Sequence, residues 1–222
     1  MNDVEIITTG DGSHSLYNKS LNETYHSQHG AIQESLHVFI VNGLNYLAKP
    51  TEGKIRILEI GFGTGLNAWL TLNANSMRPG REISYTSIEA FPLPENLWQQ
   101  LNYAGPGQEE MFSSLHKAEW NKDVPFNDLF TLRKLHTTLH DVILPSDAYD
   151  LIYFDAFAPS KQPDMWSLDI LTKVTAALAS GGVFVTYCAK GQLKRDLKSL
   201  GLIVESLPGP PPKKEMVRAL KA

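Results

Sequence analysis

The hydrophobic and polar positions of the chain follow two different periods. From residue 53 onward, short apolar runs alternate with stretches in which apolar residues recur every three or four positions. The runs are typical of buried strands, and the longer spacing predicts amphipathic helices. The predicted strands are Ile55–Ile60, Ile83–Ile88, Leu132–His140, Asp150–Phe154, Val183–Tyr187, Leu202–Leu207 and Glu215–Leu220, and the predicted helices are Leu66–Ala74, Leu93–Tyr103, Trp166–Leu178 and Gln192–Leu200. This alternation predicts an α/β fold with a mostly parallel sheet that is covered by helices on both faces.

Two regions depart from the alternation. The last two strands are joined through Pro208–Pro212, a link too short for a helical crossover, so they should pair antiparallel. Residues 104–128 are rich in glycine, proline and charge, and the pattern predicts no element for them.

The N-terminal part has its own pattern. Val4–Thr9 and Ser13–Asn18 alternate around a turn with two glycines, which predicts a hairpin. Apolar residues at helical spacing predict a helix over His29–Leu47, and Pro50–Gly53 reads as a turn. We therefore expect a hairpin and helix extension over residues 1–50 and a main domain over residues 51–222.

The strongest local signal is the sequence from Glu59 to Gly65, Glu-Ile-Gly-Phe-Gly-Thr-Gly, between a predicted strand and a predicted helix. Glycines there permit a tight turn and a close approach of the backbone to a ligand. A dinucleotide fingerprint would have glycine where this chain has Leu66, and the lysine of a phosphate loop is absent. Glu59 would repel a pyrophosphate, but a carboxylate suits a cation such as the ammonium or sulfonium group of S-adenosylmethionine.

Acidic residues also follow the next two strands. Glu89 ends the second strand, where a carboxylate can accept both hydroxyls of an adenosine ribose. Asp141 follows the third, within reach of an adenine amino group. Three acids at successive strand ends, together with the glycines, predict a class I S-adenosylmethionine-dependent methyltransferase with a Rossmann-like sheet, an antiparallel last strand and a small N-terminal extension. The alternative is a structural glycine turn among solvated acids.

The fourth strand ends in Asp155, followed by Phe157 and Pro159. Ligands of open parallel sheets bind beyond the carboxyl ends of the strands, so this carboxylate and this aromatic ring should stand beside the reactive methyl group. The segment is similar, in a different residue order, to the Asp/Asn-Pro-Pro-Tyr/Phe element of enzymes that methylate amines.

Composition and charge narrow the class of protein. The 222 residues are 42% hydrophobic and 20% charged, as in soluble globular proteins, with no apolar run long enough to span a membrane and no basic leader. We expect a cytoplasmic protein. The net charge is −4, yet residues 186–222 carry eight lysines and arginines against three acids. This basic end is either a contact surface for an anion or a solvated surface.

Five separated segments follow the motif order of one family: Tyr25–Phe39, Gly61–Asn67, Glu89–Leu93, Phe157–Trp166 and Lys213–Met216. They resemble the methyltransferase part of the tRNA 5-methylaminomethyl-2-thiouridine biosynthesis enzymes. Members are often fused to a flavin-dependent oxidoreductase part, and since this chain ends at residue 222 we expect the methyltransferase part alone. Some relatives have arginines before the Glu-Met pair that is Glu215-Met216 here. Lys213 and Lys214 at these positions keep the positive charge, but a lysine cannot bind phosphate in the bidentate way that an arginine can.

The resemblance implies N-methylation of 5-aminomethyl-(2-thio)uridine at the tRNA wobble position to 5-methylaminomethyl-(2-thio)uridine, with S-adenosyl-L-methionine as cofactor and tRNA as partner. Asp155 is the expected catalytic residue, since it can orient the amine and relay its proton. The residues expected at the cofactor are Glu59, Gly61, Gly63, Gly65, Asn67, Glu89, Asp141 and Asp155, and those expected at the substrate are Phe157, Pro159, Trp166, Lys190, Lys194, Arg195, Lys213 and Lys214.

Several alternatives stay open at this point. The substrate could be a small-molecule or protein amine, or the chain could be a non-catalytic S-adenosylmethionine-binding module. His26, His29 and His37 suggest a metal site, but because the chain has no cysteine cluster we expect no metal. The single cysteine, Cys188, is expected to be a small buried hydrophobe. The sequence leaves the oligomeric state open.

Overall fold

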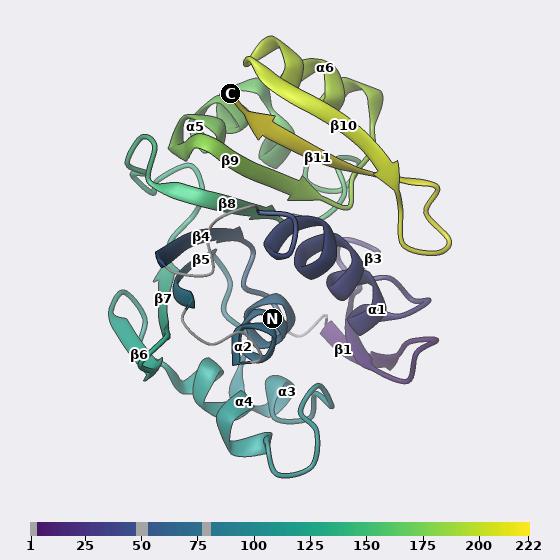
Figure 1. The fold of residues 1–222 in the computed structure, drawn as a ribbon. Coiled ribbons are helices and arrows are strands. Elements are labelled where there is room, and N and C mark those ends of the chain that lie inside the picture. The colour runs from purple at the N-terminus through teal and green to yellow at the C-terminus, as the bar shows by residue number, and fades with distance from the viewer. Residues whose placement is uncertain (1–3, 48–52, 77–80) are drawn as a thin grey trace.

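The computed structural model describes residues 4–47, 53–76 and 81–222, and a large twisted sheet runs through it (Figure 1). Its strands are β4 (Gly53–Ile60), β5 (Arg81–Glu89), β6 (Asp123–Asn127), β7 (Phe130–His136), β8 (Tyr149–Phe154), β9 (Leu178–Thr186), β10 (Leu202–Pro208) and β11 (Glu215–Lys221). They lie in the order β10-β11-β9-β8-β4-β5-β7-β6.

Strand directions confirm the predicted architecture. The five neighbours β9, β8, β4, β5 and β7 run parallel. The last strand, β11, pairs antiparallel with both β10 and β9. At the other edge, β6 pairs antiparallel with β7, a strand that the sequence pattern did not predict.

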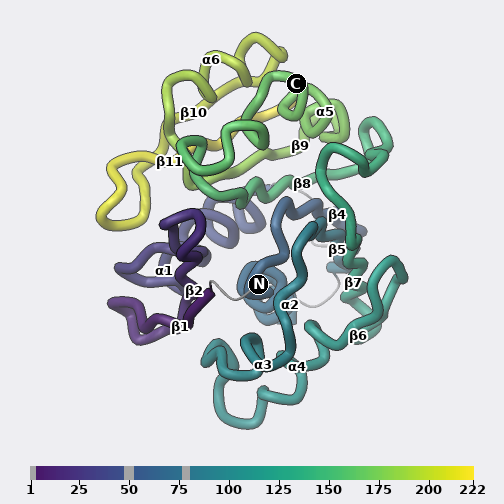
Figure 2. The backbone as a smooth tube through the Cα atoms, turned by 180° about the vertical axis from the view of Figure 1, so that it is seen from behind, coloured from purple at the N-terminus to yellow at the C-terminus, as the bar shows by residue number. Residues whose placement is uncertain are grey.

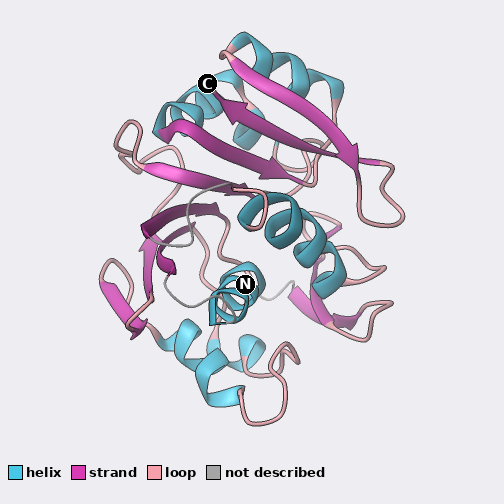
Figure 3. Ribbon diagram, in the orientation of Figure 1, coloured by secondary structure: helices cyan, strands magenta, loops and turns pink. Residues whose placement is uncertain are grey.

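Helices cover both faces of the sheet (Figure 3). Strand residues alternate between two cores: Ile57 and Tyr153 belong to one, and Leu58 and Phe154 to the other. The first core is closed by η1 (Leu36–Leu44), α2 (Leu66–Ser76) and α4 (Glu109–Lys117), and the second by α5 (Leu168–Ala177) and α6 (Gly191–Ser199). The predicted coverage of both faces is therefore confirmed.

The order of the parallel strands reverses next to β4. The chain passes outward from β4 to β5 and β7, and then returns to the other side of β4 to form β8 and β9. Connections leave neighbouring strands in opposite directions at such a point, which opens a crevice at the carboxyl ends of β4 and β8. The fold thereby fixes where a ligand can enter.

The N-terminal residues form a separate small layer. The hairpin β1 (Val4–Thr8) and β2 (His14–Asn18) is confirmed, and a short β3 (Glu23–Thr24) extends it. The predicted helix is also confirmed, as α1 (Ala31–Ser35) continuing into the π-helical η1. In Figures 1 and 2 this extension and β6 lie on opposite sides of α2. The turn predicted at Pro50 lies outside the described residues, so the boundary between residues 50 and 51 stays a prediction.

Some predicted boundaries were wrong. The helix expected over Leu93–Tyr103 is limited to α3 (Glu95–Trp98), because the N–H groups of the two residues that follow Gln99 bond to carbonyls three residues back, as in a turn, rather than four. The third strand ends at His136 rather than continuing to His140. The helix expected from Trp166 is preceded by the 3₁₀ turn η2 (Pro163–Trp166) and begins at Leu168, with the Ser167 side chain as its N-cap.

Candidate functional site

A cavity of about 770 Å³ lies at the carboxyl ends of β4, β5 and β8, where the strand order reverses. Its size is that of a small-molecule binding site. The glycine turn, the segments that follow β5, β7 and β8, the N-terminal extension and Lys213 all contribute to its lining. Residues far apart in the sequence therefore meet at one site.

The glycine turn brings backbone to the cavity surface. Gly61 and Gly63 line the cavity. Gly61 has φ +91°, and a Cβ there would lie 3.0 Å from the carbonyl oxygen of Asp155, so only glycine lets the two loops approach. Gly65 lies outside the lining, and a Cβ on it would lie 2.9 Å from Nε2 of His116. Gly65 thus permits packing beneath the turn.

The acid after β5 is tied to this turn. Glu89 lines the cavity, and its two carboxylate oxygens accept bonds from the backbone N–H groups of Gly63 (2.9 Å) and Phe91 (2.8 Å). Each oxygen keeps a further lone pair with which it can accept a ligand hydroxyl. Asp141, by contrast, is exposed on the loop after β7, accepts a bond from the Thr138 hydroxyl (2.6 Å), and is not part of the lining.

Asp155 follows β8 and reaches the cavity beside Asn67. The Asn67 amide donates a bond of 2.8 Å to Oδ2 of Asp155, and both residues line the cavity. Burial and, to a smaller extent, the Glu34 carboxylate raise the pKa of Asp155 to about 7, against the lowering effects of Asn67 and Lys213. Near neutral pH this carboxyl can therefore exist in both protonation states, as a group that exchanges protons must.

Glu59 lies beneath the cavity rather than in its lining. Its side chain is fully buried at the end of β4, and its Oε2 accepts a bond of 2.6 Å from the Ser87 hydroxyl. Burial raises the pKa of Glu59 to about 8. The structure therefore separates Glu59 from the cavity surface, although the sequence pattern grouped it with Glu89.

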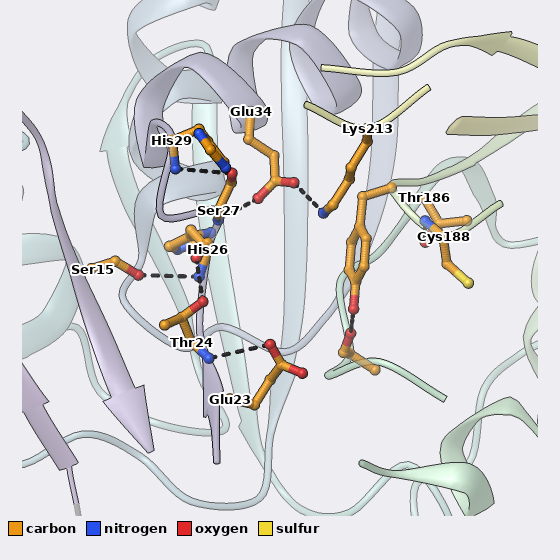
Figure 4. A network of polar contacts seen from close by, with 12 residues as sticks. Ser15, Glu23, Thr24, His26, Ser27, His29, Glu34, Thr186, Cys188 and Lys213 are labelled. Atoms are coloured by element: carbon orange, nitrogen blue, oxygen red, sulfur yellow. Dashed lines mark hydrogen bonds and ion pairs between the residues drawn. The ribbon is translucent and has the colours of Figure 1, made fainter. Parts of the chain in front are cut away.

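An ion pair joins the N-terminal extension to the C-terminal hairpin at the cavity (Figure 4). Glu34 accepts a bond of 2.7 Å from the Ser27 N–H and pairs with Lys213. The Lys213 ammonium also lies 3.9 Å from the ring centroid of Tyr187, whose hydroxyl donates to the carbonyl of Ala156 (2.8 Å). Glu34, Lys213 and Tyr187 all line the cavity.

The extension also contributes aromatic contacts. The Tyr25 ring meets the Phe157 ring edge to face at 4.9 Å between centroids. His26 is buried and bonds through Nε2 to the Thr64 hydroxyl at 2.8 Å, and burial lowers its pKa to about 4. Sequence reasoning did not single out Tyr25, Glu34 or Tyr187, although the first two lie in a segment that carried the family resemblance.

The expected substrate residues separate into two groups. Phe157 lines the cavity, whereas Pro159 and Trp166 lie outside the lining. The Trp166 indole N–H donates to the carbonyl of Phe157 (2.8 Å), and its ring packs on Phe154. Trp166 thus supports the loop that carries Phe157.

The five basic residues also separate. Lys213 lines the cavity, and Lys214 is exposed next to it in the sequence. Lys194 pairs with Glu215 at 2.6 Å. The other two are exposed and lie outside the lining, Lys190 at the N-cap of α6 and Arg195 in the middle of that helix.

The remaining candidate residues have separate partners. The backbone N–H of His29 donates to the Ser27 hydroxyl, and the ring of His37 bonds to the carbonyl of Pro208. Cys188 is buried, and burial raises the pKa of its thiol. Within residues 4–47, 53–76 and 81–222, no three metal-binding side chains gather in one place, and no helix is long and apolar enough to cross a membrane.

The sheet with its antiparallel last strand, the glycine turn after β4 and the ligand-sized cavity define a class I methyltransferase fold. A family described as S-adenosyl-L-methionine-dependent methyltransferase matches residues 96–222. The chain belongs to this family.

Named relatives point to one branch of such enzymes. The chain is 30% identical over 231 residues to the tRNA 5-methylaminomethyl-2-thiouridine biosynthesis bifunctional protein MnmC of Cupriavidus metallidurans, covering 97% of this chain and 33% of the relative. It is 29% identical over 203 residues to the protein of the same name from Chromobacterium violaceum, covering 84% of this chain and 30% of the relative. The chain thus spans about a third of the length of these relatives.

Among solved structures, the crystal structure of MNMC2 from Aquifex aeolicus superposes with a TM-score of 0.81 at 28% identity, over 98% of this chain and 70% of that one. A methyltransferase of Methanococcus maripaludis superposes with a TM-score of 0.50 at 12% identity, over 86% of this chain and 85% of that one, which reflects the shared fold.

Proposed function

We propose that the chain methylates the amine of 5-aminomethyl-(2-thio)uridine at the wobble position of tRNA and releases 5-methylaminomethyl-(2-thio)uridine. The observation that carries the proposal is the position of the Asp155 carboxyl at the cavity, on the same edge of the sheet as the glycine turn and Glu89. The names of the MnmC relatives and the superposition on MNMC2 support tRNA as the substrate. A cytoplasmic location, where tRNA is modified, is part of the same proposal.

The residues present suit the cofactor of the family. Glycine at 61 and 63 leaves these two positions of the turn without side chains, so the backbone itself borders the cavity there. Glu89 offers acceptors for the ribose hydroxyls, and Asn67 lies at the start of α2 within the same lining. When bound, S-adenosylmethionine supplies a methyl group that its sulfonium has already activated. In this proposal the loop after β7 contacts the adenine amino group. The residues just before Asp141 make that contact, since they line the cavity and Asp141 itself does not.

The protein's task is then to align the amine and remove its proton. Asp155 is positioned to accept a hydrogen bond from the amine, orient it in line with the methyl group, and take up the proton that the reaction releases. Asn67 holds one oxygen of Asp155, which leaves the other for the amine. Phe157, whose carbonyl is held by the Trp166 indole, is placed to pack on a base that has turned out of the anticodon stack, and Pro159 follows it in the same loop.

The basic residues near the cavity suit the tRNA backbone. Lys213 lies in the lining, and Lys214, Lys190, Lys194 and Arg195 extend positive charge from it over the hairpin and α6. Phosphate contacts from such side chains position a nucleic acid without reading its sequence.

Methyl transfer to defined substrates tests the proposal. The purified chain is supplied with S-adenosylmethionine carrying a labelled methyl group and with tRNA that carries 5-aminomethyluridine, and the nucleosides are then analysed by mass spectrometry. We expect labelled 5-methylaminomethyluridine, and no label in tRNA that lacks the aminomethyl group. Label in a protein fraction or in small amines, with tRNA unlabelled, would replace tRNA by another amine substrate. Cofactor binding without any transfer would indicate a binding module.

A further inference from the structure

A polar cluster lies in the floor beneath the cavity, between β4, β5, β8 and the first turn of α2. Glu59 pairs in register with Ser87 on β5 and with Tyr153 on β8. The hydrogen-bonding groups of Tyr85 and Asn67 lie beside the Glu59 carboxyl. These side chains have almost no exposure to solvent.

The cluster has fewer unpaired donors than unpaired acceptors. Oε1 of Glu59, Oδ1 of Asn67 and the hydroxyl of Tyr85 are all buried and have no hydrogen-bond partner among the described residues. An ionised Glu59 would offer only acceptors, and Oδ1 of Asn67 is an acceptor as well. The Tyr85 hydroxyl is the one donor among these three atoms, and its single proton can satisfy only one of the two acceptors. Buried polar atoms are almost always paired, because each unpaired one costs about 1–3 kcal/mol. A proton on Glu59 supplies the second donor that the cluster lacks.

We propose that Glu59 keeps its proton in the folded protein and, as a positioning residue, donates it to the Asn67 amide, which in turn holds Asp155. Two hydrogen bonds frame this arrangement. The Ser87 hydroxyl donates to Oε2 of Glu59, and the Asn67 amide N–H donates to Oδ2 of Asp155. In this arrangement Glu59 positions Asp155 through Asn67, and its neutral form adds no second negative charge beneath the catalytic carboxylate. The effect on catalysis rests on the proposed function, whereas the proton on Glu59 does not.

Burial supports this assignment, since it raises the pKa of Glu59 to about 8 against the lowering effect of the hydrogen-bonding groups of Ser87, Tyr85 and Asn67. The titratable groups that face Glu59 are Asp155 from the loop after β8, Tyr85 from β5 and Tyr153 from β8. Burial raises the pKa of both tyrosines above its usual value, so they stay neutral in the same range. Asp155 is then the one neighbour among these that changes charge together with Glu59.

The stability of the protein without substrate tests the proton directly. A carboxyl whose pKa rises from 4.5 to about 8 on folding binds more protons in the folded than in the unfolded state between these values, so stability falls as pH rises through this window. Glu59→Gln removes that contribution. We expect the denaturant midpoint of Glu59→Gln, relative to the parent chain, to rise steadily from pH 5 to pH 8. The same comparison of Glu59 with Glu59→Gln in an Asp155→Asn background removes the contribution of Asp155 to the pH dependence of stability.

The rate of single-turnover methylation tests the positioning. Glutamine keeps an N–H donor in place of the carboxyl proton, so Glu59→Gln should retain the parent rate within about threefold, whereas Glu59→Ala should lose about tenfold or more. Without a held Asn67, Asp155 also loses a bond that lowers its pKa, so the acid limb of the pH–rate profile should move upward in Glu59→Ala but not in Glu59→Gln. Asn67→Ala should move the acid limb upward in the same way. The double variant Glu59→Ala with Asn67→Ala should lose no more of the single-turnover rate than either single variant.

Controls separate these readings from a general loss of structure. Ile57→Val removes one methyl group on the same strand and sheet face, and it should lower stability without moving the acid limb. A Glu59→Gln protein that is as slow as Glu59→Ala, or a midpoint difference that does not change with pH, would overturn the proposal. If the parent chain methylates no aminomethyl tRNA, the proposed function fails, and the stability measurement still decides where the proton lies.

Discussion

One wall of the cavity consists of the ends of the parallel strands, represented by Gly61, Glu89 and Asp155. Another consists of the N-terminal extension and the C-terminal hairpin, represented by Glu34 and Lys213. We call them the strand-end wall and the extension wall. Backbone ladders hold the strand-end wall, since β4 pairs with both β5 and β8 up to Ile60. The strands of the extension form a sheet separate from the large one, so η1 packing into the first core and side-chain bonds such as Glu34 to Lys213 and His26 to Thr64 hold the extension wall in place.

This contrast teaches where substitutions should act. A side chain at the end of a paired strand can be changed while the backbone stays in place, so the effect should fall on binding or chemistry. A side chain that itself holds the extension in place should act on the stability of the wall and on the substrate. The following predictions test this division.

The largest effect is expected at Asp155 in the strand-end wall. Asp155→Asn keeps the size and one acceptor oxygen but cannot take up a proton, so single-turnover methylation should fall by roughly 100-fold or more. Affinity for S-adenosylmethionine should change far less, because the β8 backbone is unaltered. The exposed Asp164→Asn in the next turn is the matched control. A near-normal rate would make Asp155 structural, and a joint loss of rate and cofactor affinity would make it a ligand-binding residue.

The same carboxyl predicts the pH dependence of the parent chain. With a pKa of about 7, Asp155 is mostly protonated below this value and cannot accept the amine proton. The single-turnover rate should therefore rise with pH up to about 7 and fall about tenfold for each pH unit below it. A flat profile between pH 5 and pH 8 would contradict the assignment.

A smaller effect is expected at Glu89, also in the strand-end wall. Glu89→Ala removes the acceptors for the ribose hydroxyls and releases the Gly63 N–H, so S-adenosylmethionine affinity should fall by about 1–3 kcal/mol. Calorimetric titration measures this loss, and the exposed Glu95→Ala serves as control. Unchanged affinity in Glu89→Ala would remove this residue from the cofactor site.

The sequence predicted the strand-end wall better than the extension wall for a physical reason. Apolar runs locate buried strands, and in a parallel sheet the residues after successive strands meet at one edge, which brought Gly61, Glu89 and Asp155 together correctly. The spacing of apolar residues alone does not show, however, how deep a side chain lies relative to the cavity surface. Glu59 ends up beneath the cavity, and Asp141 lies five residues beyond the end of β7, outside the lining.

The extension wall depends on contacts across most of the chain. Glu34 and Lys213 are 179 residues apart, and no local pattern around either predicts that they pair. The edge strand β6 was missed for a related reason. Pro125 lacks an N–H donor, so its presence argues against a strand, but an edge strand tolerates a proline because one side of the strand needs no partner. Both features are decided by tertiary packing rather than by local sequence.

The extension wall can be tested through its ion pair. Glu34→Gln, Lys213→Met and the double variant form a cycle in which the coupling in unfolding free energy should be about 1 kcal/mol, because Glu34 is buried but Lys213 is partly exposed. Urea unfolding of the four proteins gives the coupling. The exposed pair Lys19–Glu5 provides a matched cycle, in which we expect a smaller value. Equal couplings in the two cycles would mean that the pair does not hold this wall.

The smallest effect concerns the basic residues beyond the cavity. Lys190 and Lys214 are exposed, whereas Lys194 and Lys213 are held by Glu215 and Glu34, so the first two are the better sites for neutralisation. If both contact phosphates, Lys190→Gln with Lys214→Gln should reduce the slope of log affinity for tRNA against log salt by about 0.7–0.9 for each lysine. Filter binding over a range of salt concentrations measures the slope. Lys54→Gln with Lys122→Gln changes the same charge outside the cavity lining and should leave the slope unaltered. Equal slopes for the two double variants would assign the basic end to ordinary solvated surface, and the contact with tRNA would then be confined to the cavity itself.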